Sequence, residues 1–312
     1  FQTTNKYIKI DGFTIDGTDP GQTQQNAITG VAASSYITIQ NITISHIESN
    51  AHGIFGEGDN WTFRTITING VDQVFVSYQL NGIYWGGDNN LFDGMTIYNA
   101  QAQCIQLFGD SADNNTVRNS VLYSCGGAGL AIDGDNNLIV NNIIRNNAGN
   151  GIDIDYSPGS DSNKIYNNTI NANGNFGIAV GLGTAATGNL LRNNILSNNA
   201  TYGTRLYTLA TTTTYENNLT YLNTSGTIND TGSGTVSSGN IAGDPAYVGG
   251  TNFHIQASGV ADDAGLNLTT TFTDDIDGQA RPSGGSWDIG SDEIIVADSP
   301  PAGCSSANGW SY

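Results

Sequence analysis

A repeat of about 25 residues constrains the fold of this chain more than any other feature. Each repeat is marked by an apolar residue that follows a small residue or glycine, and successive markers lie 22 to 29 residues apart. A turn ending in asparagine follows the marker, as in GEGDN, DSADNN and DGDNN, and a second alternating run such as NNLIVNNIIRNN comes next. The markers are Ile28, Ile54, Ile83, Ile105, Leu130, Ile152 and Ile178, and Thr204 continues the series.

The residues within each repeat alternate between apolar and polar over four to six positions, and no helical periodicity is present. Short strands separated by Gly, Asn and Asp at a constant period can wind into a coil of three strands per turn. Each strand then pairs in parallel with its equivalent in the next coil, about 4.8 Å away. The pattern therefore predicts an all-β parallel β-helix, with eight clear coils from Ile28 through Thr204.

One column of asparagines recurs in step with the coils, at Asn142, Asn168, Asn194 and Asn218. Asparagine tolerates the left-handed backbone conformation that a sharp corner needs. Its amide can also bond to the same amide in the next coil, as in other parallel stacks. We therefore expect an asparagine ladder with a structural role and no ligand.

The repeat divides the chain into three parts. Repeats occupy residues 1–223, and a polar stretch rich in Gly, Ser and Thr reads as a linker over 224–243. Residues 244–312 are expected to form an irregular, β-rich capping or tail region. The tail carries short motifs at Asp244-Pro245-Ala246-Tyr247, at Asp263-Ala264-Gly265, from Asp275 to Pro282, and from Asp288 to Glu293.

These repeats and tail motifs together resemble the right-handed parallel β-helix repeat superfamily, which includes pectate lyase-like enzymes, carbohydrate-binding surface proteins and phage tailspikes. The tail is similar to those of secreted bacterial and archaeal β-helix proteins. The resemblance implies a right-handed solenoid and a secreted or cell-surface location. It does not select an activity, because the superfamily hosts many functions. The Asp pair with Gly-His-Gly of polygalacturonase-like hydrolases and the Asp-Pro-His-Asp of alginate epimerases are both missing.

The charge balance excludes several classes of partner. The net charge is −19, with only 9 Lys and Arg, so nucleic acid and anionic membrane surfaces lack the clustered cations that they require. A polyanionic glycan would need bridging divalent cations. No apolar run reaches 18 residues, which argues against membrane insertion. Three cysteines, Cys104, Cys125 and Cys304, allow one disulfide, and the spacing leaves its pairing open.

Alternation sorts the first strand of each coil into inward and outward columns. Trp85 falls in the inward column, over the space left by Gly56. The outward columns bring together Asp133, Asp153 and Asp155. We expect Asp133 and Asp155 at about the 4.8 Å spacing between coils. Three interpretations stay open: a solvated acidic patch, a Ca²⁺ site, or the paired carboxylates of a glycoside hydrolase.

Three aromatic residues, Phe55, Tyr84 and Phe108, follow the same outward columns. They form either a track on which sugar rings stack or ordinary sheet-face aromatics beneath a loop. The histidines His46, His52 and His254 are scattered along the sequence and receive no role.

Two functional hypotheses follow. The favoured one is a secreted or surface module that contacts polysaccharide or builds an assembly, because turns this short cannot wall a deep cleft. The alternative is a polysaccharide-cleaving enzyme, most plausibly a hydrolase that uses the three aspartates, with a lyase less favoured. Few residues precede the first strand-like segment, so we also expect the N-terminal coil to present an open edge to other copies of the chain.

Overall fold

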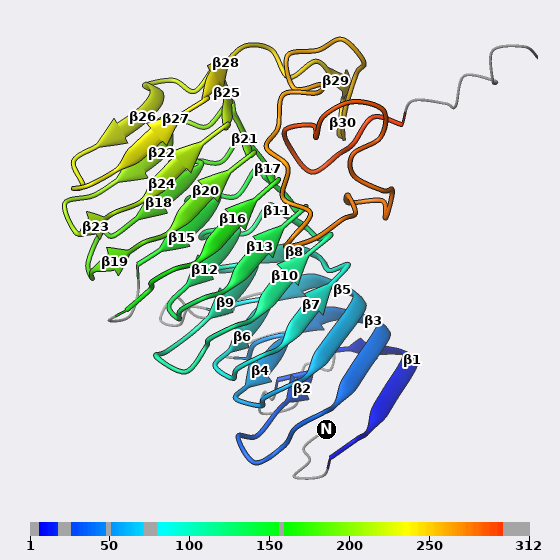
Figure 1. Cartoon of the computed structure of the whole chain (residues 1–312). Coiled ribbons are helices and arrows are strands. Elements are labelled where there is room, and N and C mark those ends of the chain that lie inside the picture. The colour runs from blue at the N-terminus through cyan, green and yellow to red at the C-terminus, as the bar shows by residue number, and fades with distance from the viewer. Residues whose placement is uncertain (1–5, 18–25, 48–50, 72–79, 156–158, 296–312) are drawn as a thin grey trace, which may run out of the picture.

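The computed structural model describes residues 6–17, 26–47, 51–71, 80–155 and 159–295. The strands stack in a column from β1 at one end to β28 at the other (Figure 1). Strands and turns make up the described ranges, and no helix long and apolar enough to cross a membrane occurs in them. The predicted parallel β-helix is confirmed.

Nine strands form one sheet of the solenoid, and each contributes one rung. Their register confirms the predicted column of markers: Ile54 pairs with Ile83, and Ile83 pairs with Ile105. The strands are β2 (Ile28–Thr29), β4 (Ile54–Gly56), β6 (Ile83–Trp85), β9 (Ile105–Leu107), β12 (Leu130–Ile132), β15 (Ile152–Ile154), β18 (Ile178–Val180), β22 (Tyr202–Leu206) and β26 (Gly226–Asp230).

Seventeen strands form the second sheet, which bends at a corner so that most coils contribute two strands. The strands before the corner are β1 (Lys9–Asp16), β3 (Thr38–Ile47), β5 (Thr62–Val71), β7 (Leu91–Asp93), β10 (Thr116–Arg118), β13 (Leu138–Val140), β16 (Lys164–Tyr166), β20 (Leu190–Arg192), β24 (Thr214–Glu216) and β27 (Val236–Ser238); β1, β3 and β5 continue through it. Those after it are β8 (Thr96–Ala100), β11 (Val121–Tyr123), β14 (Ile143–Arg145), β17 (Thr169–Asn171), β21 (Ile195–Ser197), β25 (Leu219–Tyr221) and β28 (Ile241–Ala242). Two small pairs, β19 (Ala186–Thr187) with β23 (Ala210–Thr211) and β29 (Tyr247–Gly249) with β30 (Asn252–Ile255), complete the structure.

The asparagine ladder is confirmed at the corner of the seventeen-stranded sheet. The side-chain amide of Asn142 donates to Asn168 Oδ1 at 2.9 Å, Asn168 donates to Asn194 at 3.1 Å, and Asn194 donates to Asn218 at 2.9 Å. All four side chains are buried. The left-handed residue at each corner is the asparagine one position earlier, such as Asn141 with a φ of 55°. The ladder residue and the corner residue are therefore two separate columns.

The solenoid core contains isoleucine, leucine and valine with a few large aromatics. Trp85 is fully buried, as predicted, and its indole N–H donates to the carbonyl of Gly58 at 3.0 Å. Its ring occupies the space that Gly30 leaves, since a Cβ at Gly30 would collide with it, and not the space at Gly56 that the sequence suggested, which the backbone of Gly30 fills. Cys104 and Cys125 form a buried disulfide, and Cys304 lies outside the described residues.

The solenoid continues past residue 223, where the sequence suggested a linker. Strand β26 pairs with β22, β27 with β24, and β28 with β25, so residues 224–243 form one more coil. Backbone hydrogen bonds to the preceding coil hold these strands, and this requires no apolar alternation. The three residues of β27 are exposed, so this strand has no buried apolar position that the sequence could mark.

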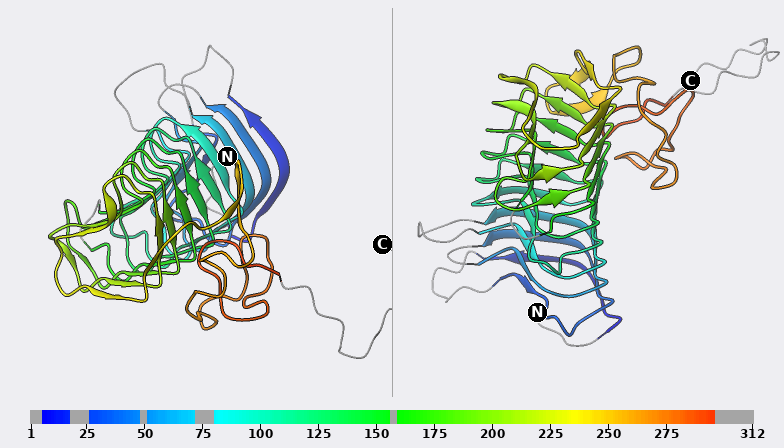
Figure 2. Two further views of the ribbon diagram at one scale, coloured as in Figure 1. Left: turned by 90° about the horizontal axis from the view of Figure 1, so that it is seen from above. Right: turned by 60° about the vertical axis from the view of Figure 1, so that its left-hand side comes forward.

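The tail, from residue 244 to 295, lies against the outer face of the seventeen-stranded sheet and not across the end of the solenoid (Figures 1 and 2). Phe272 and Trp287 pack on Val140 and Tyr166. A second apolar cluster of the tail packs on Ile195 and neighbouring residues of β25. The only regular element of the tail among the described residues is the antiparallel pair β29–β30.

Candidate functional site

The three aspartates singled out in the sequence lie on consecutive rungs of the nine-stranded sheet. Ile132 pairs with Ile154, and Asp133 and Asp155 follow these two residues. Asp153 lies within β15. The side chains are covered: Asp133 is 4% exposed, and Asp153 and Asp155 are each 6% exposed. The expected rung order therefore holds, but the aspartates do not form an open, solvated patch.

Asp133 is the most perturbed of the three. Its Oδ2 accepts hydrogen bonds from Gln106 Nε2 at 3.2 Å and from the Gly109 amide at 3.3 Å. Its Oδ1 is buried and has no hydrogen-bond partner among the described residues. Burial raises the pKa of Asp133 to about 6, and the charges of Asp155 and Asp110 add to this, whereas the two hydrogen bonds oppose it. A carboxyl with such a pKa can give up or accept a proton near neutral pH.

Asp155 and Asp153 are engaged differently. Asp155 Oδ1 accepts the backbone amides of Gly183 and Thr184 in the next coil, the latter at 3.2 Å. Burial raises the pKa of Asp155, and these hydrogen bonds oppose the rise. Asp153 Oδ2 accepts a hydrogen bond from Asn150 at 3.0 Å. Asp155 therefore holds a turn in place, and this role alone accounts for its position.

A metal site requires at least three ligand atoms that converge. Asp133, Asp153 and Asp155 are not among the described groups of three whose ligand atoms all lie within 4.8 Å of one another. Two such groups occur in the described chain, and both are in the tail: His254, Asp277 and Asp292, and Asp262, Asp263 and Asp288.

The rings of the three predicted aromatic residues lie together in one group. The rings of Tyr84 and Phe108 lie 3.9 Å apart and are parallel within 11°. Phe55 lies 6.0 Å from Tyr84 and 6.3 Å from Phe108, so the three ring centres form a triangle and not a linear stack. The ring of His52 joins this aromatic group, 5.0 Å from Tyr84 and 5.5 Å from Phe55.

His52 had no predicted role, yet it connects this aromatic group to the polar groups beside it. Its Nδ1 accepts the backbone amide of Asn81 at 3.1 Å, which leaves Nε2 to carry the proton. Burial lowers the pKa of His52 to about 4, so the ring is neutral at physiological pH. One sequence signal could have revealed His52. It lies two residues before the marker of its coil, and the polar residues Asn81 and Gln103 lie at the same position in the next two coils.

A chain of hydrogen bonds links these residues to Asp133. Asn81 Nδ2 donates to Gln106 Oε1 at 3.2 Å, and Gln106 in turn donates to Asp133. Burial raises the pKa of Tyr84, and the charge of Asp133 adds to the effect, so the tyrosine and the carboxyl share one environment. We call this group the sheet-face cluster; it consists of His52, Phe55, Asn81, Tyr84, Gln106, Phe108 and Asp133.

A second acidic column lies in the turns after the nine-stranded sheet. Each carboxylate accepts the backbone amide of the equivalent residue one coil on; for example, the Asp135 amide donates to Asp113 at 2.7 Å, and Asp161 accepts the Thr187 amide. The aspartate in each DN turn is therefore a structural ladder residue. Its members are Asp59, Asp88, Asp113, Asp135 and Asp161.

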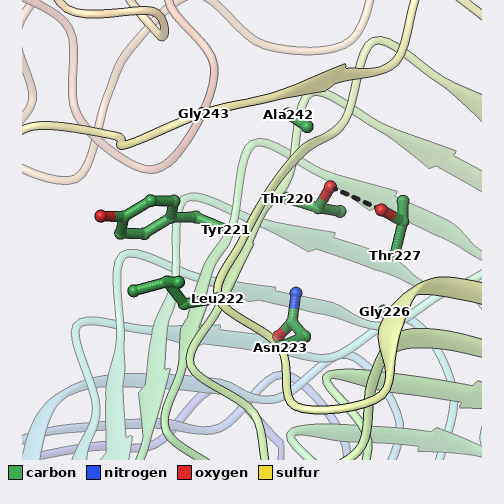
Figure 3. A pocket seen from close by; sticks show the side chains of 8 residues that line it. All are labelled: Thr220, Tyr221, Leu222, Asn223, Gly226, Thr227, Ala242 and Gly243. Carbon is green, nitrogen blue, oxygen red and sulfur yellow. Dashed lines mark hydrogen bonds between the residues drawn. The ribbon is translucent and has the colours of Figure 1, made fainter.

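A cavity of about 380 Å³ opens at the last coil, far along the stack from the sheet-face cluster (Figure 3). Thr220 and Thr227 face each other across it with their hydroxyls 3.2 Å apart. The residues lining it include no acid, histidine or basic side chain. The cavity lies at the last coil, and its lining holds no carboxyl or imidazole group for acid–base chemistry.

Comparison with known proteins places the fold. The family model for the right handed beta helix region matches residues 1–154 and 81–242, and no curated protein matches in sequence. The structure of pectate lyase Pel9A is similar at a TM-score of 0.62 and 15% identity, over 91% of this chain and 87% of that chain. The periplasmic alginate epimerase AlgG (TM-score 0.48, 12% identity, 76% of each chain) and an alginate lyase from Paenibacillus sp. str. FPU-7 (0.48, 15%, 70% of this chain and 98% of that chain) are more distant. The chain belongs to the right-handed β-helix family.

Proposed function

We propose that this protein binds polysaccharide outside the cell or at its surface, and that the sheet-face cluster is the contact surface. The observation that carries the proposal is the contact of the aromatic group with a hydrogen-bonded polar network that ends at Asp133. Aromatic rings beside amide and carboxyl groups suit a sugar, which presents C–H groups and hydroxyls together.

The charge of the protein favours a neutral glycan. Asp133 and Asp155 are both acidic, and the column of turn aspartates lies along the same side of the solenoid. A polyuronate would experience repulsion from these groups and from the net charge of −19. The expected ligand is therefore an uncharged polysaccharide.

The test is affinity electrophoresis in gels that contain neutral or uronate polysaccharides, preceded by a glycan array. Tyr84→Ala or Phe108→Ala should weaken binding at least about tenfold, as expected when an aromatic contact is truncated. Tyr123→Ala is the matched control, because Tyr98 and Tyr123 form a similar stack at 4.8 Å on the other sheet. Equal losses in all three variants, or no binding to any glycan, would contradict the proposal.

A second function, polysaccharide cleavage, is favoured by one observation: Asp133 combines a pKa of about 6 with a buried oxygen that lacks a described partner. Asp133 would be the general acid, with Asp153 or Asp155 as the second carboxylate. A reducing-sugar assay tests it. Asp133→Asn should abolish turnover and reduce glycan binding far less, because the asparagine oxygen can still accept the hydrogen bond from Gln106. If the wild-type protein cleaves none of the glycans that it binds, the cleavage hypothesis is rejected and only the binding function remains.

An extracellular location is supported by the Cys104–Cys125 disulfide, since such bonds persist in oxidising compartments. Self-association is the remaining part of the proposal. Strand β1 pairs with β3 on one side, and no strand among the described residues pairs with its other side. An open strand edge of eight residues can recruit a strand from another copy.

A further inference from the structure

We propose that Asp133 and the nearby Gln103 recognise sugar hydroxyls, and that they restrict the ligand of the sheet-face cluster to polysaccharides with free hydroxyls. This inference rests on the proposed glycan contact and specifies what the bound sugar must offer. Each of the two residues would accept one hydrogen bond from a hydroxyl of the bound segment. A hydroxyl that carries a methyl or acyl group has no proton to donate, so a substituted sugar should be rejected.

Two buried oxygen atoms in this part of the sheet lack a donor. Asp133 Oδ1 and Gln103 Oε1 are both buried without a hydrogen-bond partner among the described residues, and each side chain is only 4% exposed. A buried polar atom left unsatisfied raises the free energy of the folded protein. A ligand that brings two hydrogen-bond donors would relieve both atoms at once.

One network connects the two residues. Asn81 Oδ1 accepts the backbone amide of Gln103 at 3.0 Å, and Asn81 Nδ2 donates to Gln106 Oε1 at 3.2 Å. Gln106 then donates to Asp133 Oδ2 at 3.2 Å. The network therefore fixes the Asp133 carboxyl through Oδ2 and leaves Oδ1 for another donor. Groups held in this way are positioned before a ligand arrives.

The neighbours of Asp133 in its own column turn away from it. Phe108, one rung before, lies over Gly86, where an added Cβ would meet its ring. Asp155, one rung further on, is engaged with the Gly183 amide of the following coil. Neither neighbour supplies a donor to Asp133 Oδ1, so the donor must come from outside the column.

Sugar hydroxyls fit these acceptors better than a metal ion does. Asp133 belongs to neither of the two groups of three ligand atoms within 4.8 Å of one another in the described chain, so an ion held there would lack ligands. Gln103 is neutral and adds no charge that would attract a cation. A sugar presents several hydroxyls on one ring, and its C–H groups can contact Tyr84 and Phe108.

Asp133 should couple binding to pH. Burial raises its pKa to about 6, and the charges of Asp155 and Asp110 add to this. The titratable groups around it, none of them a cation at neutral pH, are His52, Tyr84, Asp110, Asp153 and Asp155. A hydroxyl donates more strongly to a carboxylate than to a neutral carboxyl. The sugar should therefore bind about fivefold more tightly at about pH 7 than at about pH 5, and binding should release part of a proton near pH 6.

The experiment is isothermal titration with neutral hexasaccharides of glucose, mannose and galactose, each with free and with O-methylated hydroxyls. The O-methylated form should bind at least about tenfold more weakly than the free form. Asp133→Asn and Gln103→Met should each weaken binding of the free form about fivefold. Asp133→Asn should also abolish proton release, measured in paired buffers of different ionisation enthalpy. Gln256→Met is the control, because Gln256 is exposed in the tail and its replacement should change the affinity less than about twofold.

Thermal unfolding separates recognition from a structural role. Gln103→Met removes a buried oxygen that has no donor, so its melting temperature should be unchanged or higher while its affinity falls. A lower melting temperature with unchanged affinity would mean that a buried water satisfies this oxygen, and the proposal would be overturned. Unchanged affinity in both variants, or equal binding of methylated sugars, overturns it as well and leaves the glycan contact standing. If the wild-type protein binds none of the hexasaccharides, the glycan contact and this inference are both rejected.

Discussion

Asn168 provides the most direct test of how the solenoid is stabilised. It is fully buried in the ladder. Its amide nitrogen donates to Ile139 O at 2.9 Å, to Tyr166 O at 3.0 Å and to Asn194 Oδ1 at 3.1 Å. Its oxygen accepts both the backbone amide of Asn142 at 3.0 Å and its side-chain amide at 2.9 Å. Asn168→Ala removes all five bonds.

The expected cost follows from this inventory. The amide has two hydrogens, so two of its three acceptors share one of them. A net contribution of about 1 kcal/mol for each full bond predicts a loss of about 4 kcal/mol in the free energy of unfolding. The main component is the Asn142 backbone amide, which becomes a buried donor without its acceptor. The assay is guanidinium unfolding followed by circular dichroism, with the midpoint converted through a shared slope.

Asn198→Ala is the matched control. Asn198 is exposed and has a φ of 55°, so alanine there loses only the tolerance for the left-handed conformation, at about 1–2 kcal/mol. If Asn168→Ala costs no more than Asn198→Ala, the stacked amides contribute little and the reasoning is refuted.

Three further outcomes are expected. Asp133 has a pKa raised from 3.8 to about 6, so its contribution to stability is present below about pH 4 and is lost as the pH rises through 6. The difference in unfolding free energy between wild type and Asp133→Asn should therefore change by about 2 kcal/mol between about pH 4 and 7, measured by thermal unfolding. Cys104→Ser with Cys125→Ser opens a loop with a sequence separation of 21 and should cost about 3 kcal/mol in guanidinium unfolding; no change would deny the disulfide a stabilising role. Light scattering should detect concentration-dependent assembly, and Phe13→Lys on the open strand β1 should reduce it; a monomer at all concentrations contradicts the edge model.

The repeat predicted the rungs of the nine-stranded sheet because side-chain direction in a strand depends only on alternation. The partners of Ile54, Ile83 and Ile105 were therefore predictable, as was the burial of Trp85. The amide ladder was predictable for the same reason, since equal spacing along the sequence becomes equal height along the axis.

The surroundings of the outward side chains could not be predicted in this way. Alternation indicates that Asp133 and Asp155 leave the core, but it does not reveal that turns of neighbouring coils cover them. His52 lies in a turn, where the period-two rule does not apply. The extra coil at 224–243 was missed because its strands lack an apolar pattern.

The path of the tail could not be predicted from the sequence, for a different reason. Its contacts join residues more than 70 positions apart, such as Asn193 with Leu266 and Asn167 with Asp288. Nothing in the spacing of either segment indicates this pairing. The tail motifs were visible as motifs, but their docking face was not.

The corner asparagines have a consequence for how this chain can change its length. Four of them, from consecutive coils, donate side-chain amides to tail carbonyls: Asn141 to Asp274, Asn167 to Asp288, Asn193 to Leu266 and Asn217 to Ala264. The donors are spaced about 4.8 Å apart along the solenoid axis, so each of these tail carbonyls is matched to the position of one particular coil. Inserting or deleting a coil among them would misalign every contact beyond it, whereas coils before β10 meet no such constraint from these four contacts. Growth and shortening of the solenoid are therefore expected at its N-terminal half.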